Sequence, residues 1–323
     1  MKKVLFLSLA ASAVLASCSN EVLDSVVPQE PQAISFDNAF IDNNTRAAIT
    51  NQDVTIDNLT DFYVFGSKNS ENLFTGEEKV NKSNGVWQYT NTKYWEKGVH
   101  YNFAAYSNGN ATATTTSYDP VHNTLSINEF TNTGNSDLIT AVGAKEYEGK
   151  ASDNQQVEFT FNHILSKVIF TFNTTLTKTL TVKVNNLTIT NALNHGSYNG
   201  TTWESVINAG TFAYNTPIAL PTDTQAAIES EPRYMIPQTN KSLEATFTIT
   251  ADDDKAQLHK SQEFTVSLAS GNTNLWEKGK VYNYTATITS KNIEGVEPIE
   301  FTVKAVDGWT STDAIKPTLP QVQ

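Results

Sequence analysis

The sequence contains one cysteine, Cys18, and only two arginines, Arg46 and Arg233, among its 323 residues. With a single thiol, the chain can form neither an internal disulfide nor a multi-cysteine metal site, so packing must supply its stability. Positive charge is also scarce, because 22 basic residues stand against 34 acidic ones, giving a net charge of −12. An acidic surface of this kind repels nucleic acid and argues against it as a partner.

Long apolar runs are missing except at the N-terminus, where residues 4–16 follow Lys2 and Lys3 and lead into Leu15-Ala16-Ser17-Cys18. The run is too short to cross a bilayer. A charged start, an apolar stretch and small residues before a cysteine predict a lipoprotein signal peptide over residues 1–17. We therefore expect lipid on Cys18 and a membrane-held mature chain. Loss of the two lysines would bring its net charge to about −14.

Motifs that carry chemistry are absent as well. The sequence has no phosphate-binding glycine loop, no nucleophile elbow and no zinc-protease helix. Asp252-Asp253-Asp254 lacks the spacing of a calcium loop. We therefore predict no metal, no cofactor and no catalytic residue, although carboxylates distant in sequence can meet in a fold and leave a glycan-active enzyme open. The histidines are isolated from one another: His100, His122, His163, His195 and His259.

Thr, Val, Ile, Phe and Tyr are abundant, and several stretches alternate apolar and polar residues, which is typical of half-buried strands. No stretch keeps apolar residues at helical spacing for several turns. The pattern predicts an all-β protein built of sandwiches, in which any helix is a short insertion such as residues 223–230. The clearest alternating stretches are 61–65, 157–161, 167–172, 243–249 and 299–303.

An internal repeat predicts two domains. Residues 95–103, WEKGVHYNF, recur as WEKGKVYNY at residues 276–284. The repeat indicates a turn ending at glycine, followed by a strand with alternating aromatics, with the tryptophan closing the end of a core. A polar, turn-rich boundary at 148–156 separates a domain at 47–152 from one at 153–323. Residues 18–46 form a lipidated tether and a first strand.

The scarcity of arginine points to Arg46 as a protease site. It lies in the polar stretch 42–48, after the strand-like residues 33–40. A protease reaches such turn-prone segments easily. Arg233, preceded by Pro232 and followed by a strand, should be less accessible. Taken alone, the position of Arg46 also suits an ordinary loop arginine.

Several motifs occur together along the chain: the lipobox with Thr45-Arg46-Ala47, residues 159–168 (FTFNHILSKV), Met235-Ile236-Pro237-Gln238, residues 276–282 (WEKGKVY) and residues 299–309 (IEFTVKAVDGW). In this combination and order, the chain resembles the fimbrillins, the pilins and pilus-associated lipoproteins of Bacteroidales type V pili. The resemblance covers about residues 34–309, and no single motif carries it.

The resemblance implies two tandem transthyretin-like β-sandwich domains, an outer-membrane lipoprotein, and cleavage between Arg46 and Ala47. A strand carrying Ile34, Phe36 and Phe40 would then leave with the lipid, and a strand of another pilin subunit would replace it. The C-terminal stretch with Ile299, Phe301 and Val303 is the candidate donor, although the tail beyond it carries two prolines, which cannot donate to a ladder.

On this resemblance the chain would be a fimbrial stalk, tip or anchor subunit that supports cell adhesion, without enzymatic activity. The alternative is a permanently anchored surface lipoprotein that binds a glycan or a host protein. In that case Trp87, Tyr89 and Trp203 could form an exposed stacking platform, whereas their packing into the core is the plainer interpretation.

Overall fold

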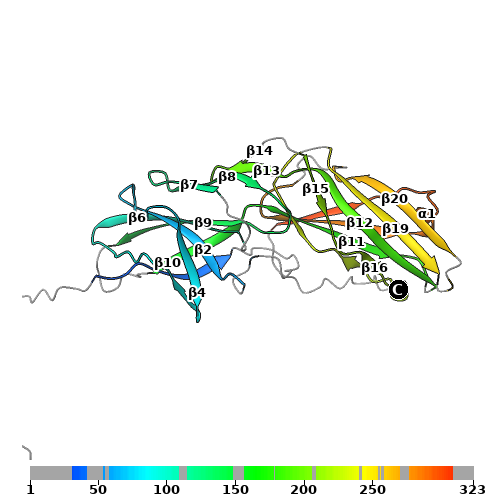
Figure 1. Cartoon of the computed structure of the whole chain (residues 1–323), viewed down its shortest axis with the longest axis horizontal. Helices are drawn as coiled ribbons and strands as arrows, with labels where there is room; N and C mark the ends of the chain where they lie inside the picture. Colours follow the sequence, from blue (N-terminus) through cyan, green and yellow to red (C-terminus); the bar gives the residue numbers. More distant parts are fainter. Residues whose placement is uncertain are drawn as a thin grey trace, which may run out of the picture. The chain divides into compact units, whose positions relative to one another are not determined.

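The computed structural model describes residues 31–41, 54, 58–108, 115–147, 156–177, 179–205, 209–239, 242–253, 255, 258–269 and 276–307. The chain from Gln32 onward forms one compact unit. Strands dominate it, and the single helix of the described residues is α1 (Ser290–Ile293) (Figure 1). No described helix has the length and apolar character needed to span a bilayer. The all-β prediction is confirmed, whereas the suggested helix at 223–230 is wrong, because Ile228–Glu229 pairs as a strand.

The N-terminal half forms an eight-stranded sheet in the order β1-β10-β9-β6-β2-β4-β5, with β3 paired to β2. Every pair is antiparallel except β1 with β10, which run parallel. Since β1 also contacts β5, at the opposite end of the order, the sheet curls around its own core. The strands are β1 (Ser35–Ile41), β2 (Asp61–Lys68), β3 (Glu71–Asn72), β4 (Glu78–Ser83), β5 (Val86–Gln88), β6 (Val99–Ser107), β9 (Ile139–Tyr147) and β10 (Gln156–His163).

The C-terminal half contains two five-stranded sheets. One has the order β17-β11-β21-β22 with β18 beside β11, and the other has β15-β12-β19-β20 with β16 beside β12. The strands are β11 (Ser166–Thr174), β12 (Leu180–Leu193), β15 (Ala209–Ala213), β16 (Ile218–Leu220), β17 (Ile228–Glu229), β18 (Arg233–Met235), β19 (Glu244–Asp253), β20 (His259–Ser267), β21 (Lys280–Ile288) and β22 (Thr302–Asp307).

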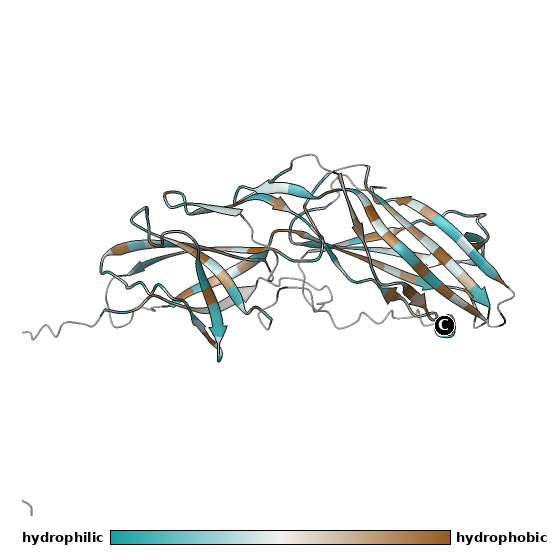
Figure 2. Cartoon of the chain, in the orientation of Figure 1, coloured by the Kyte–Doolittle hydropathy of each residue, from teal (hydrophilic) through white to brown (hydrophobic). Residues whose placement is uncertain are grey.

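One apolar core joins these two sheets into a sandwich. Phe172 from the first sheet packs against Phe247 from the second, with ring centroids 5.5 Å apart. The alternation that predicted the strands appears as brown and teal bands along β12 and β19 (Figure 2). Apolar residues of each strand therefore line the core while the polar residues between them face outward.

A smaller sheet links the two halves in the order β14-β13-β8-β7. Its strands are β7 (Thr115–Asp119), β8 (Thr124–Thr131), β13 (His195–Tyr198) and β14 (Trp203–Ser205). The pairing of β8 with β13 thus crosses the predicted boundary at 152/153. Most of the boundary segment lies outside the described residues, so the two-domain division stays a prediction.

The repeated motif has the same structure twice. Each copy turns at a glycine with positive φ, Gly98 at 74° and Gly279 at 71°, and leads into a strand, β6 or β21. Trp95 and Trp276 are buried in the two large cores. The predicted role of these tryptophans in closing the cores agrees with their positions.

Candidate functional site

The first strand lies at the edge of the N-terminal sheet, in a position that we call the seat. The seat is formed by β10 and by the aromatic rings around Phe36. The strand pairs with β10 over Ser35–Asp37 and, after a register shift, at Phe40 and Ile41. Just before the strand, Ala33 forms an antiparallel bridge with Tyr94. The chain entering β1 is therefore held on two sides, by β10 and by the loop that contains Tyr94. We call this loop, residues 89–94, together with Glu78, the clamp.

Two predicted anchor residues fill the apolar part of the seat. Ile34 is 1% exposed and Phe36 is 4% exposed. Burying two such side chains contributes about 3–6 kcal/mol by transfer alone. The ring of Phe36 lies within 5.4–6.0 Å, centroid to centroid, of four aromatic rings: Phe62, Tyr89, Phe103 and Phe159. The buried positions that the resemblance implied are thus present at Ile34, just before β1, and at Phe36, within it.

The main chain of Ile34 binds the clamp through both of its polar groups. Its N–H donates to the Lys93 carbonyl oxygen at 2.8 Å, and its carbonyl accepts from the Tyr89 hydroxyl at 2.9 Å. The same hydroxyl accepts from the Lys93 N–H at 3.0 Å. Burial raises the pKa of Tyr89, so its hydroxyl keeps the proton that it donates.

Glu78 braces the loop of the clamp through hydrogen bonds to Thr90 and Asn91. The residue is 7% exposed, and one carboxylate oxygen accepts from the N–H groups of Thr90 and Asn91, each at 3.1 Å. The other oxygen accepts from the Asn91 side-chain amide at 2.6 Å. Hydrogen bonds to a carboxylate are among the stronger ones in proteins, so the loop is held independently of the strand. Sequence reasoning missed Glu78, although its place two residues before the buried Val80 was a usable signal.

The residues predicted for processing and anchoring lie outside the described part of the chain. These are Cys18, Arg46 and Ala47, and the side chain of Phe40 is likewise not described, although its pairing with Thr160 is. After the cleavage stretch, the N–H of Val54 donates to the buried carboxylate of Asp137 at 3.2 Å, and His163 contacts the same oxygen at 2.8 Å. The chain is therefore fixed on both sides of the predicted cut.

Arg233 is buried, with 2% of its surface exposed. Its guanidinium donates to the Ala213 carbonyl and to Glu231, and it lies 4.6 Å from the centroid of the Tyr214 ring. A protease cannot reach a side chain held in this way, as the flanking Pro232 and the strand indicated.

The candidate donor residues lie at the edge of the C-terminal sandwich. Ile299 is 5% exposed, while Phe301 and Val303 are half-buried against the same core. The ladder between β22 and β21 begins only at Thr302. β22 ends the order of its sheet, so it is an edge strand, whereas the pairing of this segment with another subunit stays a prediction.

The three aromatics considered for a glycan platform belong to the packing. Trp87 is 8% exposed and contacts Phe62, and Tyr89 is occupied in the clamp. Trp203 is half-buried and donates its indole N–H to the Ile164 carbonyl at 2.7 Å. Among the described residues no group of three or more histidine, cysteine or acidic side chains is arranged to hold a metal ion.

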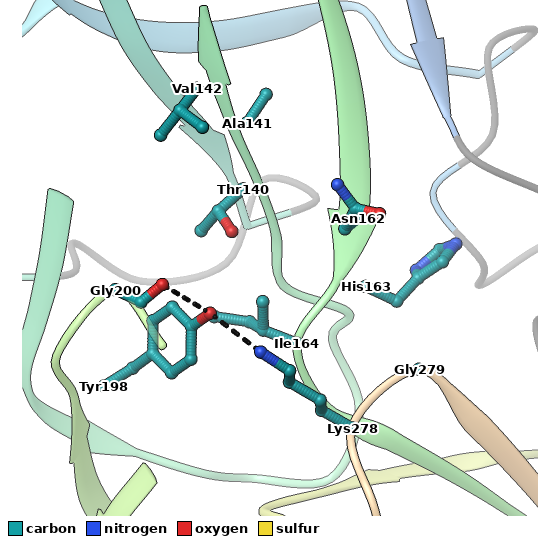
Figure 3. Close-up of a pocket in the computed structure, with 10 residues that line it drawn as sticks. All are labelled: Thr140, Ala141, Val142, Asn162, His163, Ile164, Tyr198, Gly200, Lys278 and Gly279. Carbon is teal, nitrogen blue, oxygen red and sulfur yellow. Dashed lines mark hydrogen bonds between the residues drawn. The ribbon is translucent and has the colours of Figure 1, made fainter. Parts of the chain in front are cut away.

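A separate cavity of about 390 Å³ lies where β9 and β10 approach the second tryptophan motif (Figure 3). Thr140, Val142 and Asn162 line one side, and Tyr198 and Lys278 the other. Lys278 donates to the Tyr198 hydroxyl at 3.4 Å, and this hydroxyl donates to the Gly200 carbonyl at 3.0 Å. An ammonium, an amide and hydroxyls beside an apolar valine suit a small polar ligand such as a sugar.

Together, these features define an all-β protein with an edge strand seated in an aromatic groove and a second edge strand near its C-terminus. The chain belongs to the fimbrillin-like family, whose model matches residues 45–304. The resemblance noted from the sequence is confirmed. No curated protein matches the chain.

Solved structures share the fold at low sequence identity. A fimbrial protein from Bacteroides vulgatus ATCC 8482 is 17% identical, with a TM-score of 0.62 over 86% of this chain and 100% of that one. A candidate cell adhesion protein from Bacteroides uniformis ATCC 8492 is 18% identical, with a TM-score of 0.50 over 86% and 98%. Another, from Bacteroides eggerthii DSM 20697, is 14% identical, with a TM-score of 0.50 over 87% and 97%.

Proposed function

We propose that the protein is a structural subunit or accessory protein, at the tip or the anchor, of type V fimbriae, that it supports cell adhesion, and that it acts without catalysis. The observation that carries this proposal is the seated first strand. It ends at Ile41, shortly before Arg46, and its anchors are buried like core residues. The family membership and the structural likeness to a fimbrial protein support the same role.

The proposed maturation of the chain begins with export and lipidation. Export removes residues 1–17, and lipid on Cys18 holds the precursor at the outer membrane, facing the cell exterior. An arginine-specific protease then cuts between Arg46 and Ala47, which leaves residues 18–46 attached only through noncovalent contacts. Tandem sandwiches at 47–152 and 153–323 would remain as the fibre-forming body.

Strand exchange follows from what the cut leaves behind. Without β1, the edge of β10 has unpaired main-chain groups and the seat loses Ile34 and Phe36. An incoming strand of another pilin subunit restores both, by ladder hydrogen bonds and by alternate apolar side chains. The candidate donor residues Ile299, Phe301 and Val303 present such an alternating face.

Arginine variants test the processing step. In cells that make fibres, Arg46→Ala should leave a lipidated precursor that does not enter the fibre. Arg46→Lys keeps the charge but removes the arginine, and we expect the same block. Asn44→Ala, in the same polar stretch, is the matched control because it leaves the arginine in place. Fibres of normal abundance that contain unprocessed Arg46→Ala protein, seen by electron microscopy and immunoblotting, would contradict the proposal.

A second candidate function, a permanently anchored glycan-binding lipoprotein, is favoured by the cavity at Lys278. A glycan array would show ligands that Lys278→Ala and Asn162→Ala lose and that Lys97→Ala, in the other copy of the motif, retains. Binding that none of these variants changes would place any ligand elsewhere.

A further inference from the structure

We propose that the clamp sets the register of whichever strand fills the seat, and that it accepts residues 298–301 of a second copy of this chain. In this arrangement Ile299 takes the place of Ile34, and Phe301 takes the place of Phe36. The inference rests on the proposed strand exchange and adds to it a recognition element, a partner segment and an alignment.

The clamp selects by main-chain geometry. Two of its hydrogen bonds go to the main chain of one residue, since the Lys93 carbonyl accepts the Ile34 N–H and the Tyr89 hydroxyl donates to the Ile34 carbonyl. A residue with a free N–H must therefore stand at this position, which excludes proline. The side chains add a second requirement, an apolar residue followed two positions later by an aromatic one that fits among the rings around Phe36.

The clamp is built to persist after β1 leaves. Glu78 holds Thr90 and Asn91, and Tyr89 is bonded to Lys93, all within residues 78–93. None of these bonds involves the first strand. Pre-formed polar groups recognise a partner with little ordering cost, so an incoming strand meets a ready site.

The C-terminal segment of the chain meets both requirements. Pro298-Ile299-Glu300-Phe301 aligns with Ala33-Ile34-Ser35-Phe36, and both segments have an isoleucine two residues before a phenylalanine. The proline falls at the position of Ala33, which is bridged to Tyr94. The two hydrogen bonds of this bridge run from the Ile34 N–H to the Lys93 carbonyl and from the Trp95 N–H to the Gln32 carbonyl, so neither uses the N–H of Ala33. A proline there costs the bridge no hydrogen bond.

The same segment is held in its own subunit more by apolar packing than by hydrogen bonds. It precedes the ladder, which starts at Thr302. The side-chain amide of Asn292 donates to the carbonyls of Glu297 and Pro298, at 3.2 and 2.9 Å. Apart from these bonds, Ile299 and Phe301 are kept in place by apolar packing, which the seat of a neighbouring subunit can replace. The segment can thus exchange one aromatic surrounding for another.

A disulfide test measures the alignment directly. In the assembled state, position 298 of one copy should lie opposite position 94 of the next, as a non-hydrogen-bonded pair, whose Cβ atoms are close enough for a disulfide. Full-length chains carrying Tyr94→Cys with Pro298→Cys, expressed in fibre-forming cells, should give covalent multimers that collapse on reduction. Tyr94→Cys with Ile299→Cys shifts the alignment by one and should give none.

Two further chains complete the design. Tyr94→Cys with Ala33→Cys should form an intramolecular bond in the precursor, which checks the geometry at the seat. Adding Arg46→Lys to the 94/298 pair should abolish the multimers. Normal fibres without 94/298 multimers, or with multimers from 94/299, would overturn the alignment while leaving strand exchange intact. If subunits of the unmodified protein do not exchange strands at all, the proposed function itself is wrong.

A second measurement does not depend on introduced cysteines. Tyr89→Phe removes one hydrogen bond to the incoming strand, so its fibres should lose subunits about fivefold faster in mild denaturant. Tyr94→Phe, on the same segment and half exposed, should not change the rate. Equal rates for Tyr89→Phe and the unmodified protein would show that the clamp does not hold the strand.

Discussion

The two copies of the tryptophan motif make the same turn but are completed by different parts of the chain. In each copy a tyrosine hydroxyl accepts the N–H of the glutamate after the tryptophan, Tyr101 from Glu96 and Tyr282 from Glu277, both at 2.9 Å. The N–H of Trp95 bonds the carbonyl of Gln32, ahead of the first strand, and that of Trp276 bonds the carbonyl of Gln238.

The two copies differ in whether cleavage after Arg46 would remove the residue that bonds the tryptophan N–H. Gln238 follows β18 inside the C-terminal half, so its motif remains complete whatever happens near the N-terminus. Gln32 belongs to the segment that cleavage after Arg46 would detach. One sequence unit thus closes a permanent core in the C-terminal half and, under our proposal, a replaceable one in the N-terminal half. The comparison shows that a repeated motif can specify a turn without specifying its partner.

The largest expected effect is a loss of stability in the N-terminal half that is present before processing and absent after it. Phe36→Ala should destabilise the precursor by about 3–5 kcal/mol, because it empties a packed aromatic site. It should not change the stability of the processed fibre, since the residue is then gone. Phe172→Ala, in the C-terminal core, should cost a similar amount in both states. Denaturant unfolding of precursor and fibre measures both, and a Phe36→Ala loss that persists after processing would contradict the comparison.

Glu78→Gln should have the next largest effect. An amide cannot accept hydrogen bonds on both ends, so one group of Asn91 loses its acceptor, at a cost of about 1–3 kcal/mol. Unlike Phe36→Ala, this change should act before and after processing, because the clamp stays with the body. Glu71→Gln, on an exposed strand, is the control. Thermal unfolding of both variants is the measurement, and equal midpoints would show that Glu78 does not brace the loop.

The glycine turns test whether the two motifs are equivalent. Gly98→Ala and Gly279→Ala each place a side chain at positive φ, which should cost about 1–2 kcal/mol. An added Cβ at Gly98 meets nothing within 4 Å, and at Gly279 it meets only the His163 carbonyl at 3.4 Å, an ordinary contact. Chemical denaturation should therefore give similar losses, whereas a several-fold difference would mean that the turns are not equivalent.

The smallest effect concerns the tyrosine hydroxyls of the motif. Tyr101→Phe and Tyr282→Phe each remove one acceptor from a glutamate N–H, and we expect losses of about 0.5–1.5 kcal/mol. The two losses should agree if the turns are equivalent. Tyr63→Phe, half-buried in the same sheet as Tyr101, serves as a control. A negligible change for one tyrosine and a large one for the other would break the equivalence.

Alternation along the sequence predicted strands, because a strand's two faces follow from local spacing, whereas the buried positions of Ile34 and Phe36 were implied by the resemblance to the fimbrillins. The repeat predicted both turns for the same reason. The pattern did not predict that β1 pairs in parallel with β10, over one hundred residues away, since partner choice depends on the whole sheet. The register shift between Asp37 and Phe40 likewise interrupts the regular pairing of β1, and nothing in the sequence pattern or in the resemblance indicated it.

The clamp was missed for a related reason. The sequence indicated a role only for the ring of Tyr89, as an exposed stacking residue or as part of the core, yet its hydroxyl bonds both Lys93 and Ile34, which lies 55 residues away in the chain. Hydrogen bonds between distant main-chain groups leave no periodic signature. Glu78 left a weak one, as an acid on the inward face of β4, and a buried acid of this kind needs partners. Inward acids in strands therefore merit attention when a sequence is interpreted.

The most direct test of the account is the N-terminus of the assembled protein. Intact mass and N-terminal sequencing should be measured on material sheared from cells and on the membrane fraction. We predict a chain that begins at Ala47 in the sheared fibres and a precursor that begins at lipidated Cys18 in the membrane. A chain that begins at Cys18 in both fractions would contradict the removal of the first strand and would favour a static surface lipoprotein.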